Sequence, residues 1–306
     1  MQIGIIDIGS NSIKLLIGKR DQSGQFRQSL FEVEEKRIGE GMTLDPPRIL
    51  EADIEMGVEA IARLQSQARQ YDVESLKVVA TSAVRDARNK AEFSKAVMDA
   101  TGIRVDILSG DDEARLIGKG SLQDPELFDL DNFVLIDLGG GSMECILFKE
   151  RIQRAHRSFN LGAVRLASTF VQDRGQPLSQ KSESLIAEHV HQALSNSSSI
   201  SPDPGIKTAV LTGGASSVLD RILYSRSKAE STTISDLQSL CREICSADIE
   251  DRVTRIGIPR ERADIFPAAA TIVRTALEYL ECDTARFTRF NLRAGLIAEM
   301  LENGVS

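Results

Sequence analysis

Residues 133–148 read FVLIDLGGGSMECILF. An apolar run ends in an Asp, three glycines and a Ser, and the alternating residues that follow predict a second strand. Three successive glycines are unfavourable inside a strand, because glycine loses much backbone entropy on folding and packs no side chain. The pattern therefore predicts a hairpin whose tip lies so close to a ligand that no side chain fits.

A second copy of this pattern lies near the start of the chain, where residues 3–18 read IGIIDIGSNSIKLLIG. At a constant offset of 130 residues, Asp7 matches Asp137, Gly9 matches Gly139, Ser12 matches Ser142 and Leu16 matches Ile146. Two unrelated hairpins are the alternative, since Gly and Ser are common in any turn. The joint match of strand, Asp, Gly and Ser favours duplication, and we expect two related domains that face one another across a cleft.

Each predicted tip has the chemistry of a phosphate site. Successive backbone N–H groups without side chains can converge on an anion, and a Ser hydroxyl adds a further donor. An Asp at the end of the strand can hold Mg²⁺ or another divalent cation through its oxygens or through water. Neither tip is a P-loop, because no Gly-Lys-Ser/Thr motif is present and no helix follows directly.

Length and composition set limits on the protein class. A chain of 306 residues predicts two domains, and 42% hydrophobic with 27% charged residues is typical of a soluble globular protein. No run of apolar residues is long enough to span a membrane, and the amino terminus runs into a strand without a basic segment, so we expect no signal peptide. The net charge of -8 argues against a general nucleic-acid binder but allows an anionic ligand in a local basic pocket.

The cysteines and histidines indicate no metal or nucleophilic centre. The four cysteines fit a reducing cytoplasm, and Cys241 with Cys245 has the spacing of one helix face but no partner pair nearby, so all four are interpreted as ordinary thiols, half-buried or buried. The three histidines form no constellation with a Ser and an Asp and are interpreted as structural or solvated. The histidines are His156, His189 and His191.

Beyond the two tips, several motifs resemble the exopolyphosphatase and guanosine pentaphosphate phosphohydrolase family, within the actin, hexokinase and sugar-kinase superfamily. The resemblance runs along nearly the whole chain. It rests on DIGSNSIKLLI and DLGGGSMECIL at the two tips, VVATSAVRDARN (78–89), LSGDDEARLI (108–117), NLGAVRL (160–166) and AVLTGGASSVL (209–219).

The resemblance implies an α/β fold of two actin-like ATPase (ribonuclease H-like) domains, 1–124 and 125–306, with the active site in the cleft between them. It implies hydrolysis of the terminal phosphoanhydride of inorganic polyphosphate or of guanosine pentaphosphate, and a homodimer. The implied catalytic residues are Glu113, which directs the attacking water, and Arg85. The implied metal ligands are Asp7, Asp137 and Glu144. The implied phosphate-binding residues are Gly9, Ser10, Asn11, Ser12, Gly139, Gly140, Gly141, Ser142, Arg165, Gly213, Gly214 and Arg293.

Three of these assignments have plain structural alternatives. Glu113 follows Asp111 and Asp112, and such acidic clusters commonly offset the macrodipole at a helix N-terminus. Glu144 alternates with apolar residues and could lie on a solvated strand face. Arg85 could be a surface charge, although it follows a predicted strand, where an Arg fork can bind phosphate oxygens in a bidentate way.

The segment TRFNLRAGL (288–296) departs from the family pattern, in which acids stand at the positions of Arg289 and Ala294. We expect the added charge of Arg289 to favour a longer or more highly charged anion. Two other classes of function stay open: a nucleotide-binding sensor without turnover, and a sugar or acid kinase.

Hydrophobic periodicity predicts the elements that carry these motifs. Strands are expected near 2–8, 13–19, 26–33, 77–81, 133–138, 143–149, 152–159 and 208–212, and helices near 49–70, 89–100 and 110–121. The acidic, Pro-containing segment 122–132 is expected to link the domains, and the Ser-rich segment 195–205 is expected to be a surface loop.

Overall fold

The computed structural model of the chain describes residues 2–22, 26–227 and 232–303. The chain forms two compact units, of which the first holds Met1–Gln123 with Phe290–Ser306 and the second holds Asp124–Arg289. The first boundary lies one residue from the predicted one. The last segment differs, because the sequence placed 290–306 in the second domain whereas it packs with the first unit.

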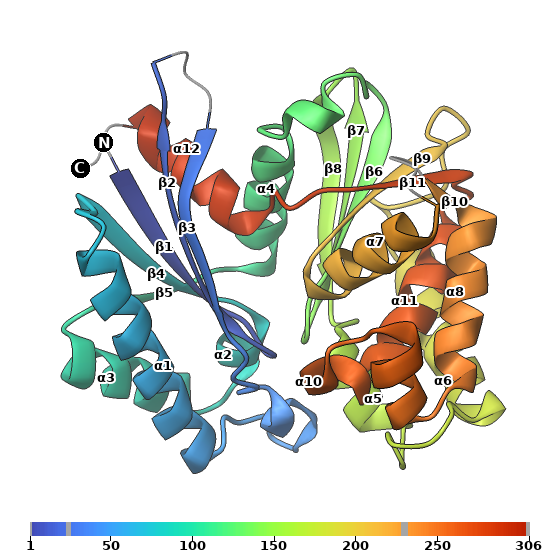
Figure 1. The fold of residues 1–306 in the computed structure, drawn as a ribbon, viewed down its shortest axis with the longest axis horizontal. Coiled ribbons are helices and arrows are strands. Elements are labelled where there is room, and N and C mark those ends of the chain that lie inside the picture. The colour runs from blue at the N-terminus through green and yellow to red at the C-terminus, as the bar shows by residue number, and fades with distance from the viewer. Residues whose placement is uncertain (1, 23–25, 228–231, 304–306) are drawn as a thin grey trace. The chain divides into compact units, whose positions relative to one another are not determined.

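A five-stranded mixed sheet forms the centre of the first unit, in the order β3-β2-β1-β4-β5 (Figure 1). The first three strands pair antiparallel as consecutive hairpins, whereas β4 and β5 continue the sheet parallel to β1. The strands are β1 Gln2–Ile8, β2 Ile13–Arg20, β3 Phe26–Glu34, β4 Ser75–Ala80 and β5 Val105–Ile107.

The helices of the first unit cover this sheet and build its core. On α1 (Glu51–Arg69) the buried residues Ala60, Ile61, Leu64 and Ala68 recur at helical spacing, so one face of the helix packs on the apolar strands. The remaining helices are η1 Glu40–Thr43, α2 Ser82–Asp86, α3 Lys90–Thr101, α4 Gly110–Ser121 and α12 Leu292–Asn303.

The close packing of α12 against α4 explains why the end of the chain joins the first unit (Figure 1). A β-carbon on Gly120 would overlap the carbonyl of Asn291, and one on Gly295 would overlap the carbonyl of Leu116. The two backbones can therefore approach only because both positions are glycine.

The second unit repeats the same sheet pattern. Its order is β10-β11-β9-β6-β7-β8, with β6, β7 and β8 antiparallel and with β9 and β11 parallel to β6. The series β8-β7-β6-β9-β11 thus corresponds strand for strand to β3-β2-β1-β4-β5. The strands are β6 Phe133–Leu138, β7 Met143–Lys149, β8 Ile152–Phe159, β9 Thr208–Thr212, β10 Thr232–Thr233 and β11 Thr284–Phe287.

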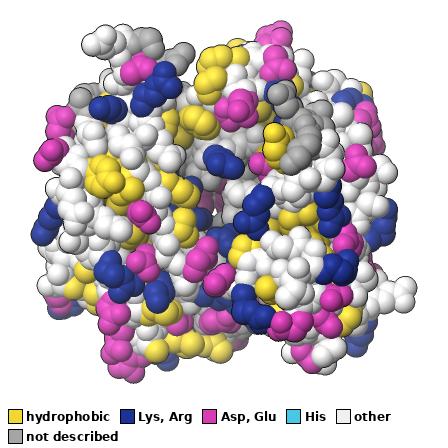
Figure 2. All heavy atoms as spheres, viewed as in Figure 1, with side chains coloured by type: hydrophobic (Ala, Val, Ile, Leu, Met, Phe, Trp, Pro, Cys, Tyr) yellow, Lys and Arg dark blue, Asp and Glu magenta, His cyan; other side chains and the backbone are white. Residues whose placement is uncertain are grey.

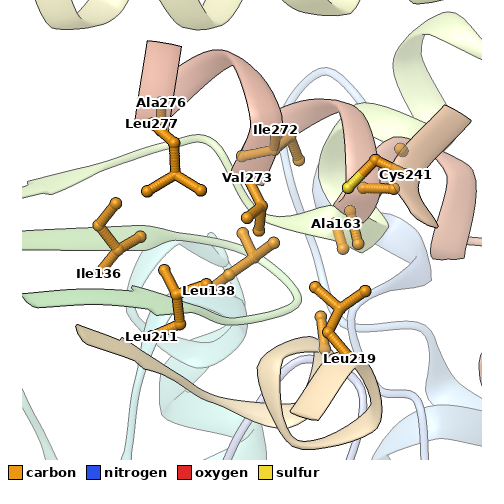
Figure 3. Packing of buried hydrophobic residues seen from close by; sticks show 14 of the residues in the cluster. Ile136, Leu138, Ala163, Leu211, Leu219, Cys241, Ile272, Val273, Ala276 and Leu277 are labelled. Carbon is orange, nitrogen blue, oxygen red and sulfur yellow. The ribbon is translucent and has the colours of Figure 1, made fainter. Parts of the chain in front are cut away.

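Helix α11 (Phe266–Tyr279) lies at the centre of the second unit's core (Figure 3). Its buried Ile272, Val273 and Leu277 lie in the same apolar cluster as Ile136 and Leu211 of the sheet. The other helical segments are η2 Pro125–Leu127, α5 Ala163–Phe170, α6 Gln180–Ser195, α7 Gly214–Ser227, α8 Ile234–Ser246, α9 Ile249–Asp251, the π-helical η3 Arg252–Ile256 and α10 Arg260–Ala263.

Periodicity predicted the long elements well. All eight expected strands and three expected helices are present within two residues of their expected ends, and the loop expected at 195–205 begins at Asn196, because Ser195 still ends α6. The short elements β5, α2 and η1, together with β10 and β11, were missed. They hold between two and five residues each, too few to give a period.

The surface is rich in charged side chains of both signs, as the 27% of charged residues in the sequence indicates. On the face shown in Figure 2, Lys and Arg side chains are interspersed with Asp and Glu, and the hydrophobic side chains form separate patches. Among the described helices, none combines the length and the apolar character that a membrane span requires.

Candidate active site

The two predicted tips have the same backbone geometry. The N–H of Gly9 donates to the carbonyl of Ser12 at 3.1 Å, and the N–H of Gly139 donates to the carbonyl of Ser142 at 3.0 Å. A β-carbon on either glycine would lie 3.1 or 3.2 Å from that serine carbonyl, which is tighter than ordinary contact. The repeat read from the sequence is therefore a repeat in structure, including the position where glycine is needed.

Helix α5 braces the second tip from one side. The carbonyl of Gly139 accepts the N–H of Ala163 at 3.0 Å, and the carbonyl of Gly140 accepts the N–H of Val164 at 2.8 Å. The carbonyl of Gly141 accepts Nε of Arg165 at 2.8 Å. Arg165, predicted to contact substrate, thus has part of its guanidinium engaged in holding the tip.

This bracing fixes where the N–H groups of the tip point. In a planar trans peptide the C=O and the following N–H point in opposite directions. Since the carbonyls of Gly139, Gly140 and Gly141 face α5 and Arg165, the N–H groups of Gly140, Gly141 and Ser142 point the other way. Three successive N–H groups directed to one side make an anion site of the kind the sequence predicts.

Two buried carboxylates flank the second tip. Asp137 on β6 and Glu144 on β7 stand opposite each other in the hairpin register, and their residues are 8% and 2% exposed. Ser158 on β8, opposite Glu144, donates to its Oε1 at 2.6 Å. Glu144 therefore lies on a buried strand face, and the alternative of a solvated position is wrong.

The corresponding pair in the first unit has the opposite character. Lys14 stands opposite Asp7, at the position that corresponds to Glu144. Oδ2 of Asp7 accepts Nη1 of Arg293 at 2.5 Å, and both side chains are at most 10% exposed. At the hairpin position opposite the Asp, the first tip therefore has a cation and the second tip has an acid.

These donor sets differ in how well they fit a divalent cation. The described residues contain no group of three or more His, Cys, Asp or Glu side chains arranged as a metal site. The pair Asp137 and Glu144 fits Mg²⁺, because this ion commonly takes one or two protein carboxylates and completes its octahedron with water and phosphate oxygens. One oxygen of Asp7 is engaged by Arg293, so its role as a metal ligand stays a prediction.

The side chains of the first tip are tied to neighbouring segments. Ser10 Oγ lies 3.1 Å from Ser82 Oγ, a residue that sequence reasoning did not single out. The Asn11 amide accepts Nε of Arg37 at 2.9 Å and donates to Glu35 at 3.2 Å. Ser12, the third predicted side-chain donor of this tip, is buried, with an exposed fraction of 3%. Of the predicted ligands in this tip, Asn11 is thus engaged through both ends of its amide.

Arg85 and Glu113, 28 residues apart in the sequence, form an ion pair. Nη1 of Arg85 donates to Oε2 of Glu113 at 2.7 Å and to the carbonyl of Leu108 at 3.2 Å. Glu113 is 6% exposed, whereas Asp111 and Asp112 in the same helical turn are exposed. The neighbouring acids occupy the helix N-terminus as the alternative proposed, but Glu113 faces inward to Arg85.

The turn after β9 lies against the second tip. Gly213 has φ +96, and a β-carbon there would lie 2.5 Å from Oδ1 of Asp137. A β-carbon on Gly214 would overlap Nη1 of Arg262, so this guanidinium lies directly against the turn. Sequence reasoning missed Arg262, because it stands far along the chain in a four-residue helix without a recognisable motif.

Arg88 and Asn89, at the end of the motif 78–89, and Arg289 lie in loops. Asn89 donates to the carbonyl of Ile49 and accepts its N–H, each at 2.9 Å, so its amide joins two loops. Arg88 and Arg289 are exposed. Arg289 lies near Asp220, and its charge offsets part of the effect by which burial raises the pKa of that carboxyl.

The histidines and cysteines have the ordinary roles that the sequence predicts. His189 and His191 are exposed on α6, where they pack against the rings of Phe170 and Tyr279. The four cysteines are free and buried, and burial raises the pKa of each thiol.

Known proteins resemble this chain along nearly all of its length. The family model of the Ppx/GppA phosphatase family matches residues 17–304. A curated relative from Aeromonas salmonicida, named guanosine-5'-triphosphate,3'-diphosphate pyrophosphatase, is 26% identical over 97% of this chain and 59% of its own length. The chain therefore spans about three-fifths of the length of this relative.

Two solved structures resemble the whole chain. The Aquifex aeolicus member of the Ppx/GppA family has a TM-score of 0.79 at 25% identity, covering 100% of this chain and 99% of its own. An exopolyphosphatase from Cytophaga hutchinsonii has a TM-score of 0.86 at 21% identity, covering 99% and 98%. Two mixed sheets with the same strand order, each carrying a Gly/Ser tip, define a protein of the actin-like ATPase superfamily. Within it, the chain belongs to the Ppx/GppA phosphatase family.

Proposed function

We propose that the protein hydrolyses the terminal phosphoanhydride of inorganic polyphosphate and releases orthophosphate, with Mg²⁺ or another divalent cation as cofactor. The observation that carries this proposal is the second tip, where three N–H groups point away from α5 beside the buried carboxylates Asp137 and Glu144. Such a tip offers donors for phosphate oxygens, and the two carboxylates would hold a cation that neutralises phosphate charge. The name of the Cytophaga relative, an exopolyphosphatase, supports this substrate.

Guanosine pentaphosphate is the second candidate substrate. The Aeromonas relative is named a pyrophosphatase of guanosine-5'-triphosphate,3'-diphosphate, which is this nucleotide, and both substrates end in the same phosphoanhydride. The anion site described above requires only that terminal group, so it is compatible with either substrate. Cytoplasmic location and assembly into a homodimer stay predictions.

In the proposed reaction the chain positions groups and stabilises charge, which is what phosphoryl transfer needs. The N–H groups of Gly140, Gly141 and Ser142 hold the terminal phosphate oxygens. Asp137 and Glu144 would hold the cation, which neutralises negative charge on the phosphate when it is bound. Ser158 fixes the rotamer of Glu144 through its 2.6 Å hydrogen bond.

Glu113 and the arginines supply the remaining roles. The carboxylate of Glu113, which is held by Arg85, takes a proton from water as the water oxygen attacks the terminal phosphorus. The bond from phosphorus to the bridging oxygen breaks, and the shortened chain leaves as an anion. Arg262, Arg165 and Arg293 are assigned to phosphate oxygens, because a guanidinium binds them through two donors at once.

The experiment measures orthophosphate release by the purified protein. Substrates are polyphosphates of several lengths, guanosine pentaphosphate and ATP, each with and without Mg²⁺. We expect cation-dependent release that is lost in Asp137→Ala. The matched control is Asp131→Ala, since Asp131 is exposed just before β6 whereas Asp137 is buried near its other end.

Each other class of function gives a different result. A sensor would bind nucleotide without releasing phosphate from any substrate. A kinase would move the phosphate to an added acceptor and release little of it. Release that is equal in wild type and Asp137→Ala would contradict the assignment of the second tip.

A further inference from the structure

Arg252 is the largest fully buried side chain of the second unit, with an exposed fraction of 0%. It begins the π-helical segment η3. Its guanidinium donates to three backbone carbonyls, those of Arg174 at 2.8 Å, Ala263 at 3.1 Å and Gln176. A single side chain thus joins the segment after α5, the start of η3 and the end of α10.

The burial of this charge is costly, and desolvation lowers the pKa of Arg252. Its Nε is buried without a hydrogen-bond partner in the described part of the chain. An apolar side chain of similar size often serves stability as well as a buried charge does. The planar fork adds fixed geometry, because its donors require carbonyls in set directions.

The main chain at Arg252 is also constrained. Its carbonyl accepts the N–H of Gly257 at 3.1 Å and the N–H of Ile258 at 2.9 Å, which closes the π-turn, and Gly257 follows at φ +90. Local π-turns occur often beside functional sites. The side chain and the main-chain carbonyl of Arg252 therefore both constrain the path of the chain into α10.

The end of helix α10 is held at the two residues that follow Arg262. Ala263 is bound through its carbonyl by Arg252, and Oδ2 of Asp264 lies 3.5 Å from Nη1 of Arg174. Arg174 in turn donates to Ser168 Oγ at 2.7 Å, on α5, the helix that braces the second tip. The network thus fixes Arg262 to the same element that holds the phosphate-binding tip.

We propose that Arg252 is a positioning residue: it fixes α10 so that the Arg262 guanidinium lies against the Gly213–Gly214 turn, where it binds a substrate phosphate. This inference rests on the proposed function, because it takes Arg262 to contact the substrate. Arg252 itself is buried and touches no substrate. Its effect on the reaction passes through Arg262 alone.

The test is a double-mutant cycle of Arg252→Met and Arg262→Ala, with kcat and KM measured for phosphate release. A displacement of about 1 Å can cost about 100-fold in rate. We therefore expect kcat/KM to fall about 10- to 100-fold in Arg252→Met. In the Arg262→Ala background the same substitution should change kcat/KM less than about twofold, because the group that it positions is gone.

A control separates positioning from general loss of stability. Leu194→Ala removes a fully buried side chain of α6 that takes no part in this network. Both proteins are assayed well below their unfolding temperatures, and Leu194→Ala should keep the wild-type kcat/KM. Arg252→Lys keeps the charge but not the fork, so it provides a milder variant should Arg252→Met fail to fold. We expect its kcat/KM to fall as well.

Hydrogen exchange of the amides of Ala263, Asp264 and Ile265 gives a readout that does not depend on activity. We expect exchange there to accelerate in Arg252→Lys and to stay at the wild-type rate in Leu194→Ala. The inference is overturned if the two arginine substitutions multiply in kcat/KM, if Arg262→Ala retains wild-type kcat/KM, or if exchange at α10 is unchanged. If the wild type hydrolyses no phosphoanhydride, the proposed function fails instead, and the exchange experiment still tests whether Arg252 fixes α10.

Discussion

Replacement of Glu113 by Gln is the sharpest perturbation of the proposed mechanism. Oε2 of Glu113 accepts a 2.7 Å hydrogen bond from Nη1 of Arg85, and the residue is 6% exposed. Glutamine has nearly the same shape and keeps an oxygen that can accept this bond. The substitution therefore removes the negative charge and the basicity while it leaves the packing almost unchanged.

The expected effect on the rate is large and that on stability is small. Loss of a general base costs about 10²- to 10⁴-fold in kcat, or about 3–5 kcal/mol in the activation free energy. KM should change little, because Glu113 is assigned to the attacking water rather than to the substrate. Exchange of a charged for a neutral acceptor should cost about 1 kcal/mol in the free energy of unfolding.

The assay follows orthophosphate release at saturating substrate and Mg²⁺, with thermal unfolding measured in parallel. Asp111→Asn is the matched control, since Asp111 lies in the first turn of the same helix but is exposed. We expect this control to retain kcat. Undiminished turnover in Glu113→Gln, or an equal loss in Asp111→Asn, would remove Glu113 from the role of base.

Three further results are expected. Gly295→Ala should lower the free energy of unfolding by about 1–3 kcal/mol, because its methyl group would meet the rigid carbonyl of Leu116; thermal unfolding measures this loss. Glu299 accepts a 2.7 Å bond from Arg115, which holds the pKa of Glu299 below its ordinary value of 4.5. This pair stabilises the fold above that value and loses its effect as the pH falls through the lowered pKa, so the Tm difference between wild type and Glu299→Gln should shrink on acidification. Arg289→Asp should raise the KM for long polyphosphate more than the KM for guanosine pentaphosphate, and it should make the KM for long polyphosphate less dependent on salt. Equal effects on both substrates would mark Arg289 as a surface charge.

The sequence predicts the parts of the candidate site whose residues lie close together in the chain. The two tips carry their own signal, since an Asp, glycines and a Ser between two apolar runs specify a hairpin with a bare tip. The tight Gly9 and Gly139 turns follow from this pattern, and so does the pairing of Asp137 with Glu144 across the hairpin. The burial of Glu144 does not follow from this pattern, because alternation places a residue on one of two strand faces without showing which face is covered.

The sequence did not predict the hydrogen-bond and packing partners that come from distant segments of the chain. Ser82, Ser158 and Arg262 have no pattern of their own, and they join the tips only through strand pairing and helix packing.

The sequence by itself determined the duplicated α/β architecture, because period and turn chemistry repeat at a fixed offset and short-range rules suffice to fix each hairpin. Only the tertiary structure decided that residues 290–306 return to the first unit, because this depends on the close packing that Gly120 and Gly295 permit between helices far apart in the chain. It likewise decided that Asp7 is engaged by Arg293, which stands 286 residues further along the chain. Lys14 and Glu144 differ at matching positions of the two hairpins, which the sequence shows, but the contacts with Arg293 and Ser158 form only when distant segments fold together.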